Sequence, residues 1–191
     1  MSDSKPVLTV IVASIRDGRK GRAVADWFVA EAQKHGGFDV QIADLKSIDL
    51  PLMTEPNHPR MKQYTQEKTW EWSRMIDASD AFAFVMPEYN HSLIAPLANA
   101  IDYLSQEWNH KPAAIVSYGG LSGGQRAAQD LRTRLTALSV VSMPAQVSLP
   151  FFNEHITDGI FEGYELANVA VNDVVTAMAK WHPALQTLRP E

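Results

Sequence analysis

The chain contains no cysteine, so disulfides, thiolate metal sites, iron–sulfur clusters and cysteine nucleophiles are all excluded. No stretch approaches the roughly 20 consecutive apolar residues that a membrane-spanning helix needs. Positive charge is also scarce, because 17 Lys and Arg stand against 22 Asp and Glu. The net charge of −5 argues against a nucleic-acid partner or a polybasic membrane patch. The chain starts with polar residues that do not resemble a signal peptide, and we therefore expect a cytoplasmic protein.

What is present is the composition of an ordinary folded protein. Hydrophobic residues make up 46% of the 191 residues and charged residues 20%, which is typical of globular chains and not of disordered ones. The length suits one domain with a sizeable core, and no repeat or linker composition divides it. A single domain over residues 1–191 is therefore predicted.

Short apolar runs alternate with helical patterns along the chain. Residues 7–13 (VLTVIVA) are β-branched and almost without alternation, which is typical of a parallel strand buried on both faces. Prolines indicate an irregular loop over 44–64, which is a candidate to cover a bound ligand or a partner subunit. Further strands are predicted at 38–43, 81–86, 113–117 and 140–149 (interrupted by Pro144), and helices at 22–35, 65–78, 96–107, 125–138 and 164–181.

This alternation predicts an α/β doubly wound parallel sheet with five strands and helices on both faces. The length suits the flavodoxin-like strand order 2-1-3-4-5. Ligands of such sheets bind beyond the carboxyl ends of the strands, where the strand order reverses. For this order the reversal lies between the first and third strands, so the turns that follow them are the first candidates for a site.

The turn after the first strand (SIRDGRKGR, residues 14–22) is unusually basic for an acidic protein. Its cations precede a helix whose free amides attract anions, Ser14 adds a hydroxyl donor, and glycine lets the backbone approach an oxyanion. We interpret the turn as a phosphate site and favour two of the cations over the others; the alternative is a solvated basic loop. The favoured pair is Arg16 and Arg22, and the others are Arg19 and Lys20.

Two other phosphate-handling arrangements are excluded. The glycine–lysine–serine/threonine triplet of a P-loop is absent from the turn. The first strand also does not end in the acidic pair with which a phospho-receiver domain binds magnesium. A phosphate monoester held without a metal fits the residues better.

The turn after the third strand reads MPEYNHS (residues 86–92), in which a proline, an aromatic ring and an amide cluster. Tyr89 is placed to cover one face of a planar heterocycle. The alternative is that Asn90 or Ser92 only shapes the turn before the next helix. His91 is a candidate proton donor, although a lone histidine in a turn is more often structural or exposed to solvent.

The turn after the fourth strand is rich in glycine (SYGGLSGG, residues 117–124). A dinucleotide fingerprint would need an acidic residue about 20 positions later, at the end of the next strand, and residues 138–142 contain none. We interpret the turn as a loop that lies against a flat ring through its backbone amides. The alternative is that its glycines serve only a tight turn.

Together these turns resemble the NADPH-dependent FMN reductase family of flavodoxin-like proteins. The matching segments are VIVASIRDGRKGRAVADW, MPEYNHSLIAPLANAIDYLSQEW and KPAAIVSYGGLSGGQRAAQDLR, of which the middle one is the most specific. The sequence departs from the family pattern at Ala13, where glycine is usual, and at Ala98, where lysine is common.

The resemblance implies which residues bind the cofactor. The first turn would bind the FMN phosphate, and the PEYN turn would border the isoalloxazine ring, with the glycine-rich loop near it. The implied cofactor-binding residues are Ser14, Arg16, Gly21, Arg22, Ala23, Val24, Pro87, Glu88, Tyr89, Asn90, Ser117, Tyr118, Gly119 and Gly120. No metal is implied.

The function implied is hydride transfer from NADPH or NADH, through FMN, to a small acceptor such as a quinone, an azo compound, a free flavin or an oxidised metal. The flavin carries this chemistry, so the protein needs no acid–base pair of its own. The resemblance also implies a homodimer or homotetramer with shared sites. Two alternatives stay open: a one-electron carrier like flavodoxin, and a non-catalytic flavin-binding redox sensor.

The large aromatic residues are ambiguous at this level. Helical spacing predicts core or interface positions for four tryptophans: Trp27, Trp70, Trp72 and Trp181. Trp108 and residues 151–152 lie near predicted strand ends, where pocket and core are both compatible with the pattern.

Overall fold

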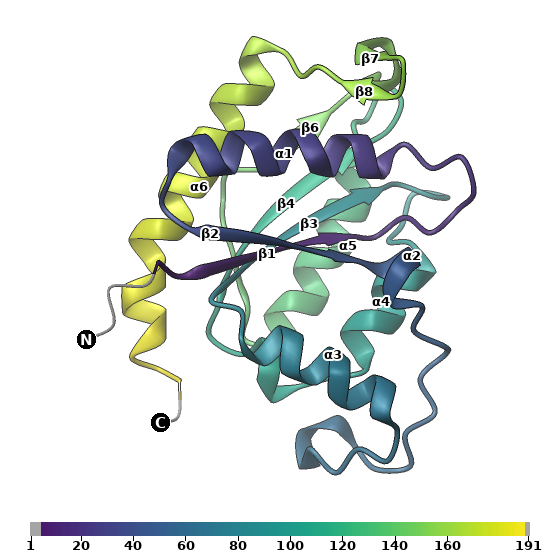
Figure 1. Ribbon diagram of the computed structural model, residues 1–191, viewed down its shortest axis with the longest axis vertical. Coiled ribbons are helices and arrows are strands. Elements are labelled where there is room, and N and C mark those ends of the chain that lie inside the picture. The colour runs from purple at the N-terminus through teal and green to yellow at the C-terminus, as the bar shows by residue number, and fades with distance from the viewer. Residues whose placement is uncertain (1–4, 190–191) are drawn as a thin grey trace.

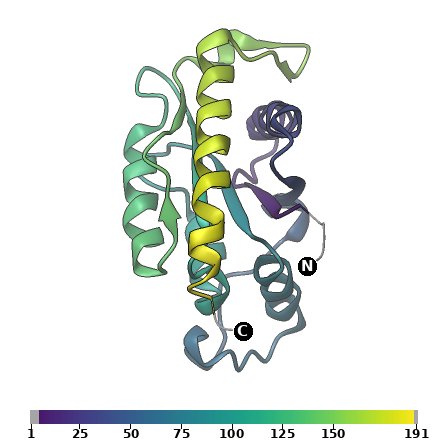
Figure 2. The same cartoon turned by 90° about the vertical axis from the view of Figure 1, so that its left-hand side faces the viewer.

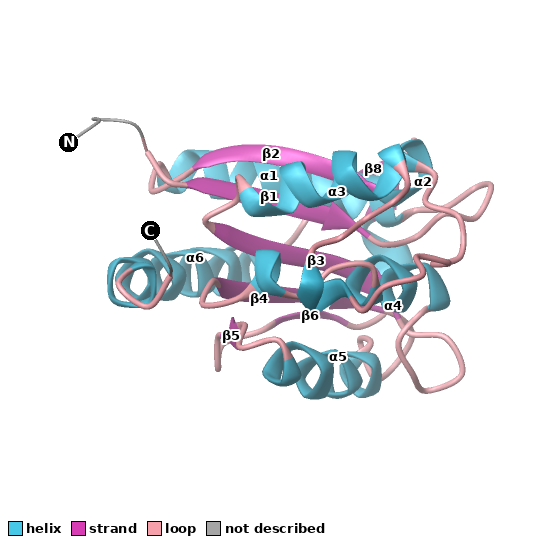
Figure 3. Ribbon diagram, turned by 90° about the horizontal axis from the view of Figure 1, so that it is seen from below, coloured by secondary structure: helices cyan, strands magenta, loops and turns pink. Residues whose placement is uncertain are grey.

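A computed structural model describes residues 5–189 and has a parallel sheet at its centre (Figure 1). The strand order is β2-β1-β3-β4-β5, with β6 also paired to β4, and Figure 3 shows the strands side by side. The predicted flavodoxin-like order and doubly wound fold are confirmed. The strands are β1 (Val7–Val12), β2 (Asp39–Asp44), β3 (Ala81–Pro87), β4 (Pro112–Tyr118), β5 (Val141–Ser142) and β6 (Val147–Leu149).

Helices cover both faces of the sheet (Figures 1 and 2). One face carries α1 (Gly21–His35) and the long α6 (Glu165–Gln186), which also contact each other. The other face carries α3 (Glu67–Asp77), α4 (Ala95–Asp102) and α5 (Gln125–Ala137).

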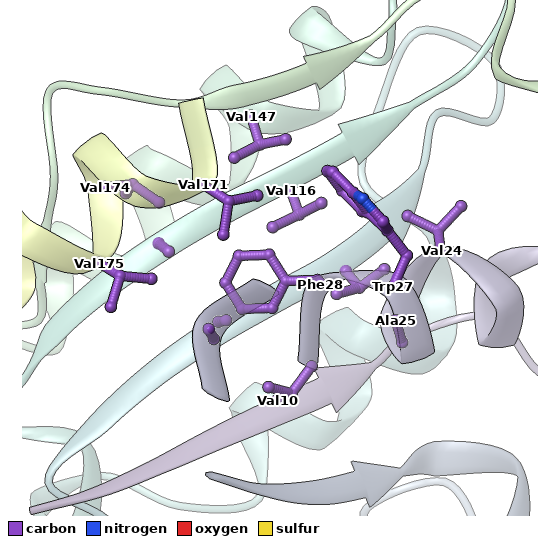
Figure 4. Packing of buried hydrophobic residues seen from close by; sticks show 14 of the residues in the cluster. Val10, Val24, Ala25, Trp27, Phe28, Val116, Val147, Val171, Val174 and Val175 are labelled. Carbon is purple, nitrogen blue, oxygen red and sulfur yellow. The ribbon is translucent and has the colours of Figure 1, made fainter. Parts of the chain in front are cut away.

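Side chains of the buried strands alternate between two hydrophobic cores, one on each face of the sheet. Leu8, Val10 and Val12 of β1 pack toward α1 and α6, whereas Ile11 packs toward the opposite face. In the first core, Phe28 of α1 lies among valines of β4 and α6 (Figure 4). Because every position of β3 and β4 is buried, neither strand shows the polar alternation of a solvent-facing strand.

The second core is built around aromatic residues. Trp108 contacts Phe82 and Trp72 at ring-centroid distances of 4.9 Å and 6.0 Å. Both indole nitrogens donate to carbonyl groups near the end of α4. Trp108 therefore belongs to the core. Trp27 is buried too, whereas Trp181 is 47% exposed.

Three details differ from the sequence prediction. The predicted last strand is two short strands, because Pro144 lies between them and has no N–H to pair. The predicted irregular loop 44–64 contains a four-residue helix, α2 (Leu45–Ile48), and a 3₁₀ turn, η1 (Pro59–Met61). The helix predicted to reach residue 107 ends at Asp102 and is followed by a 3₁₀ turn, η2 (Gln106–Trp108).

The structure also adds elements that the sequence analysis missed. A 3₁₀ turn, η3 (Phe152–His155), leads into an antiparallel hairpin of β7 (Ile156–Thr157) and β8 (Ile160–Phe161). Phe161 packs edge-on against Trp27, with ring centroids 5.1 Å apart, so the hairpin is fastened to α1.

Within residues 5–189, every helix falls short of the length and apolarity needed to cross a bilayer. That residues 1–191 form a single domain stays a prediction, and residues 1–4 and 190–191 lie outside the described part of the chain.

Candidate functional site

A pocket of about 410 Å³ lies beyond the carboxyl ends of β1, β3 and β4, where the strand order reverses. This volume falls in the range of small-molecule and cofactor sites. The pocket is walled by three turns and by η3. Its lining residues are Ser14, Arg16, Asp17, Gly18, Arg19, Lys20, Pro87, Glu88, Tyr89, Tyr118, Gly119, Gly120, Phe152 and Asn153.

The basic turn leads into a helix whose N-terminus has free amides. Helix α1 begins at Gly21, has no acidic residue in its first turn, and receives no side-chain cap from the described residues. Its first N–H groups and its dipole therefore favour an anion. Beside it lies Ser14, which is only 3% exposed, and its buried hydroxyl oxygen has no hydrogen-bond partner among residues 5–189.

The cations of the turn have different roles. Arg19 donates to both carboxylate oxygens of Asp44 at the end of β2, with one distance of 2.6 Å, and to the carbonyl oxygen of Ser14. Burial acts to raise the pKa of Asp44, but the hydrogen bonds from Arg19 and from the Lys46 amide outweigh it and hold the pKa below its usual value. Arg19 therefore braces the turn against β2 from within the pocket lining.

The other two arginines point differently. Arg22 is half-exposed on α1, where it is paired with Asp26 at 2.8 Å and also lies 3.6 Å from the Asp44 carboxylate. The guanidinium carbon of Arg16 lies 5.7 Å from the ring centroid of Tyr89. Arg16 thus spans the mouth of the pocket from the first turn to the second by a cation–π contact.

The PEYN turn is closed by reciprocal backbone hydrogen bonds between Tyr89 and Ser92. Asn90 and His91 between them have φ values of 50° and 62°. Two successive positive φ values define the tight turn that asparagine favours. Asp130 of α5 fixes the far side by accepting from the Ser92 hydroxyl and the Leu93 amide.

Glu88 joins the PEYN turn to the glycine-rich loop. Its carboxylate accepts from the backbone amides of Arg126 and Ala127 at 2.9 Å and 3.3 Å, so it caps α5. Burial acts to raise the pKa of Glu88, but these amides and the Arg126 guanidinium outweigh it and hold the pKa below its usual value. The Glu88 carboxylate is thus ionised, and its negative charge is stabilised by groups of the protein itself.

The glycine-rich loop approaches the end of β4 too closely for side chains. A Cβ on Gly124, whose φ is +79°, would lie 3.0 Å from the backbone of Tyr118. The Ser117 hydroxyl donates to the Gly123 carbonyl at 2.7 Å and holds the loop from below. Tyr118 itself turns into the pocket, where its ring packs against Phe152 at 4.6 Å.

Comparison with known proteins agrees with this geometry. The family described as NADPH-dependent FMN reductase matches residues 6–154. The chain belongs to this family. An NAD(P)H-dependent FMN reductase of Schizosaccharomyces pombe is 36% identical over 159 residues, which cover 82% of this chain and 79% of that protein.

Two further likenesses extend the comparison. An NAD(P)H:quinone oxidoreductase of Solanum tuberosum is 36% identical over 96 residues, 49% of this chain and 46% of that protein. The solved structure of FerB, a flavoenzyme NAD(P)H:(acceptor) oxidoreductase from Paracoccus denitrificans, has a TM-score of 0.74 at 22% identity. It covers 94% of this chain and 98% of FerB, and at this identity it supports the fold alone.

The structure brings together eight of the fourteen residues implied by the family resemblance: Ser14, Arg16, Pro87, Glu88, Tyr89, Tyr118, Gly119 and Gly120. The other six lie behind or beside the lining. Gly21, Ala23 and Val24 form the start of α1, Arg22 is half-exposed on the same helix, Ser117 is buried under the glycine-rich loop, and Asn90 is exposed at the tip of the PEYN turn. His91 is also exposed and lies outside the lining.

Some lining residues received little or no weight in the sequence analysis. No sequence signal indicates Asp17, Gly18 or Asn153, and the pattern around Phe152 is compatible with both pocket and core. An Asp-Gly pair at 158–159 between short apolar runs is a hairpin signal that would have predicted β7 and β8.

The residues fit FMN as this family would hold it. An unpartnered buried hydroxyl and free helix amides meet the needs of a phosphate monoester without a metal. The aromatic ring of Tyr89 and the glycine backbone border the rest of the pocket and suit a planar heterocycle. Both parts of the cofactor therefore have matching surfaces in one pocket.

Proposed function

We propose that this chain is an FMN-dependent oxidoreductase that takes hydride from NAD(P)H and reduces a quinone in the same pocket. The observation that carries the proposal is the buried Ser14 hydroxyl at the uncapped start of α1, which makes no hydrogen bond to any residue that the structure describes. Burying an unpartnered polar group costs free energy, so it indicates a ligand that completes the hydrogen bond. The family match supports FMN as that ligand.

The basic turn provides the anchor for the cofactor tail. We assign the phosphate to Ser14, Arg16 and the first amides of α1, because Arg22 is engaged with Asp26. Arg19 serves the anchor by bracing the turn through Asp44. This assignment explains why the turn is basic while the protein as a whole is acidic.

The opposite end of the pocket determines the acceptor. Exposed apolar side chains lie beside the mouth: Leu121 at 81% and Phe151 at 47% exposure. Leu121 follows a lining glycine, and Phe151 donates its amide to the Gly120 carbonyl, so both lie at the rim. An apolar rim suits a flat, hydrophobic acceptor, and the quinone oxidoreductase of Solanum tuberosum supports a quinone among the acceptors.

Bound FMN supplies the redox chemistry, because its ring takes up and releases hydride. The chain's part is to position and shield. Tyr89 and the glycine-rich loop form the walls, and Glu88 keeps the two walls together by capping α5. No side chain is required as acid or base, and His91 is assigned no role because it lies outside the lining. Because the hydride donor and the electron acceptor would occupy the same pocket in turn, we expect ping-pong kinetics.

The experiment is a visible spectrum of the purified protein after addition of FMN, then of NADPH without oxygen, then of a benzoquinone. We expect a flavin spectrum that NADPH bleaches rapidly and the quinone restores, with parallel steady-state lines. Stable colour that NADPH leaves unchanged would indicate an electron carrier. A folded protein that binds no FMN would overturn the proposal. A homodimer or homotetramer and a cytoplasmic location stay predictions.

A further inference from the structure

We propose that the Tyr118 hydroxyl is a phosphate ligand and makes this protein select FMN over unphosphorylated riboflavin. This inference rests on the proposed function, because it concerns the same pocket. The family resemblance places the loop of Tyr118 near the isoalloxazine ring. The inference instead places the Tyr118 hydroxyl at the phosphate of FMN.

The first step is the position of the Tyr118 hydroxyl. A Cβ built on Gly21 would lie 2.2 Å from the Tyr118 hydroxyl oxygen and 2.4 Å from the Ser14 hydroxyl oxygen. Both hydroxyls therefore converge on the first residue of α1. The side chain of Tyr118 starts on β4, which is separated from β1 by β3, and reaches across to this point.

The second step is that this position is fixed. The Tyr118 backbone pairs with Pro87 of β3 and Leu149 of β6, and its ring packs against Phe152. Only 3% of the residue is exposed. A hydroxyl held so firmly loses little freedom when it binds a ligand, which makes it an effective donor.

The third step is the chemistry at this point. The amides of α1 and the buried Ser14 hydroxyl already form an anion site, and the adjacent Tyr118 hydroxyl adds a donor to it. Burial raises the pKa of Tyr118 to about 12, against the lowering effect of the neighbouring Ser14 hydroxyl, so the phenol stays protonated and donates throughout the neutral range. A hydrogen bond from a neutral donor to a phosphate oxygen is charge-assisted and stronger than an ordinary one.

The arrangement also explains Gly21. Any side chain at position 21 would occupy the space that the two hydroxyls fill, so the helix must begin with glycine. Glycine here has a negative φ, and the requirement is therefore one of space and not of backbone conformation.

The test compares two flavins on the apo-protein. Tyr118→Phe removes one oxygen and keeps the ring against Phe152. We expect the Kd for FMN, measured by quenching of flavin fluorescence, to rise about tenfold, the loss of one hydrogen bond to a charged group. The Kd for riboflavin, which has no phosphate, should change less than twofold. Tyr164→Phe is the matched control, because Tyr164 lies outside the pocket lining against His155, and both constants should be unchanged.

A second measurement keeps the result interpretable. The ³¹P resonance of bound FMN should move in Tyr118→Phe and stay in place in Tyr164→Phe, whatever the affinity for riboflavin. Thermal unfolding of each apo-variant checks that it is folded. An unchanged FMN constant with an unchanged ³¹P resonance overturns the inference, as does an equal loss for FMN and riboflavin. Wild-type protein that binds neither flavin would instead refute the proposed function.

Discussion

The two ends of the sheet both carry a pocket and buried polar groups, but these groups are paired within the protein at one end only. At the carboxyl end, the Ser14 hydroxyl and the first amides of α1 lack partners among the described residues. At the amino end, a cavity of about 760 Å³ is lined by Glu107 and Lys111, and both are held by the protein itself.

The contacts at the amino end are complete. Glu107 accepts from the Tyr64 hydroxyl at 2.8 Å and the Ser73 hydroxyl at 2.7 Å. Lys111 donates to the carbonyl groups of Ile76 and Asp77 at the end of α3. Polar groups there are paired within the protein, whereas we propose that those at the carboxyl end pair with a ligand. The size of a cavity therefore says less about function than the state of the polar groups around it.

The largest expected effect is at the amino end. Glu107→Ala would leave buried donors unpaired, and we expect the free energy of unfolding to fall by about 3–5 kcal/mol. Urea denaturation measures it. Glu107→Gln, which keeps one acceptor oxygen, should lose less, and Glu71→Ala on the exposed face of α3 should stay within about 0.5 kcal/mol. If folded Glu107→Gln bound FMN more weakly than wild type, the two ends of the sheet would not have the separate roles described here.

The next effect is a pH dependence from Lys111. Burial lowers its pKa from 10.5 to about 8. Between these values the unfolded chain holds the proton and the native chain has released it, so raising the pH favours the native state. The neutral amine still has two N–H donors for its two carbonyl partners.

We expect the unfolding free energy of wild type, relative to Lys111→Met, to rise by about 3 kcal/mol from pH 8 to 10.5. Chemical denaturation of both proteins at several pH values tests this. A flat difference would show that Lys111 keeps its proton, and the charge at the amino end would then need a partner other than the two carbonyls.

The smallest effect has the opposite sign at the carboxyl end. Ser14→Ala removes a buried hydroxyl that makes no hydrogen bond within residues 5–189, so the apo-protein should become more stable by about 1 kcal/mol. The same change should weaken FMN binding about tenfold. Thermal unfolding of apo-protein and FMN titration measure the two results. A loss of stability together with unchanged FMN affinity would contradict the contrast between the ends.

The sequence predicted the fold well because its signals are local. Buried strands such as β1 and β3 carry unbroken apolar runs, and glycines end α1 where the pattern stops. Helix α4 ends early for a reason that is not local. The Glu107 carboxylate binds Tyr64 and Ser73, which lie 43 and 34 positions away, and this fixes a separate turn after the helix.

The location of the site could be predicted from the sequence, but most of its side-chain contacts could not. The reversal of strand order and the three turns located the pocket. The partner of Arg19 is 25 positions away on β2, and no spacing rule connects it to Asp44. In the same way, the reach of Tyr118 across β3 to Gly21 depends on the assembled sheet.

The break at Pro144 has a consequence for how these molecules meet each other. It divides the outer border of the sheet next to β4 into pieces of two and three residues. Pieces so short present little continuous backbone onto which a neighbouring molecule could add a strand. At this border of the sheet, the proline therefore limits strand addition by a neighbouring molecule.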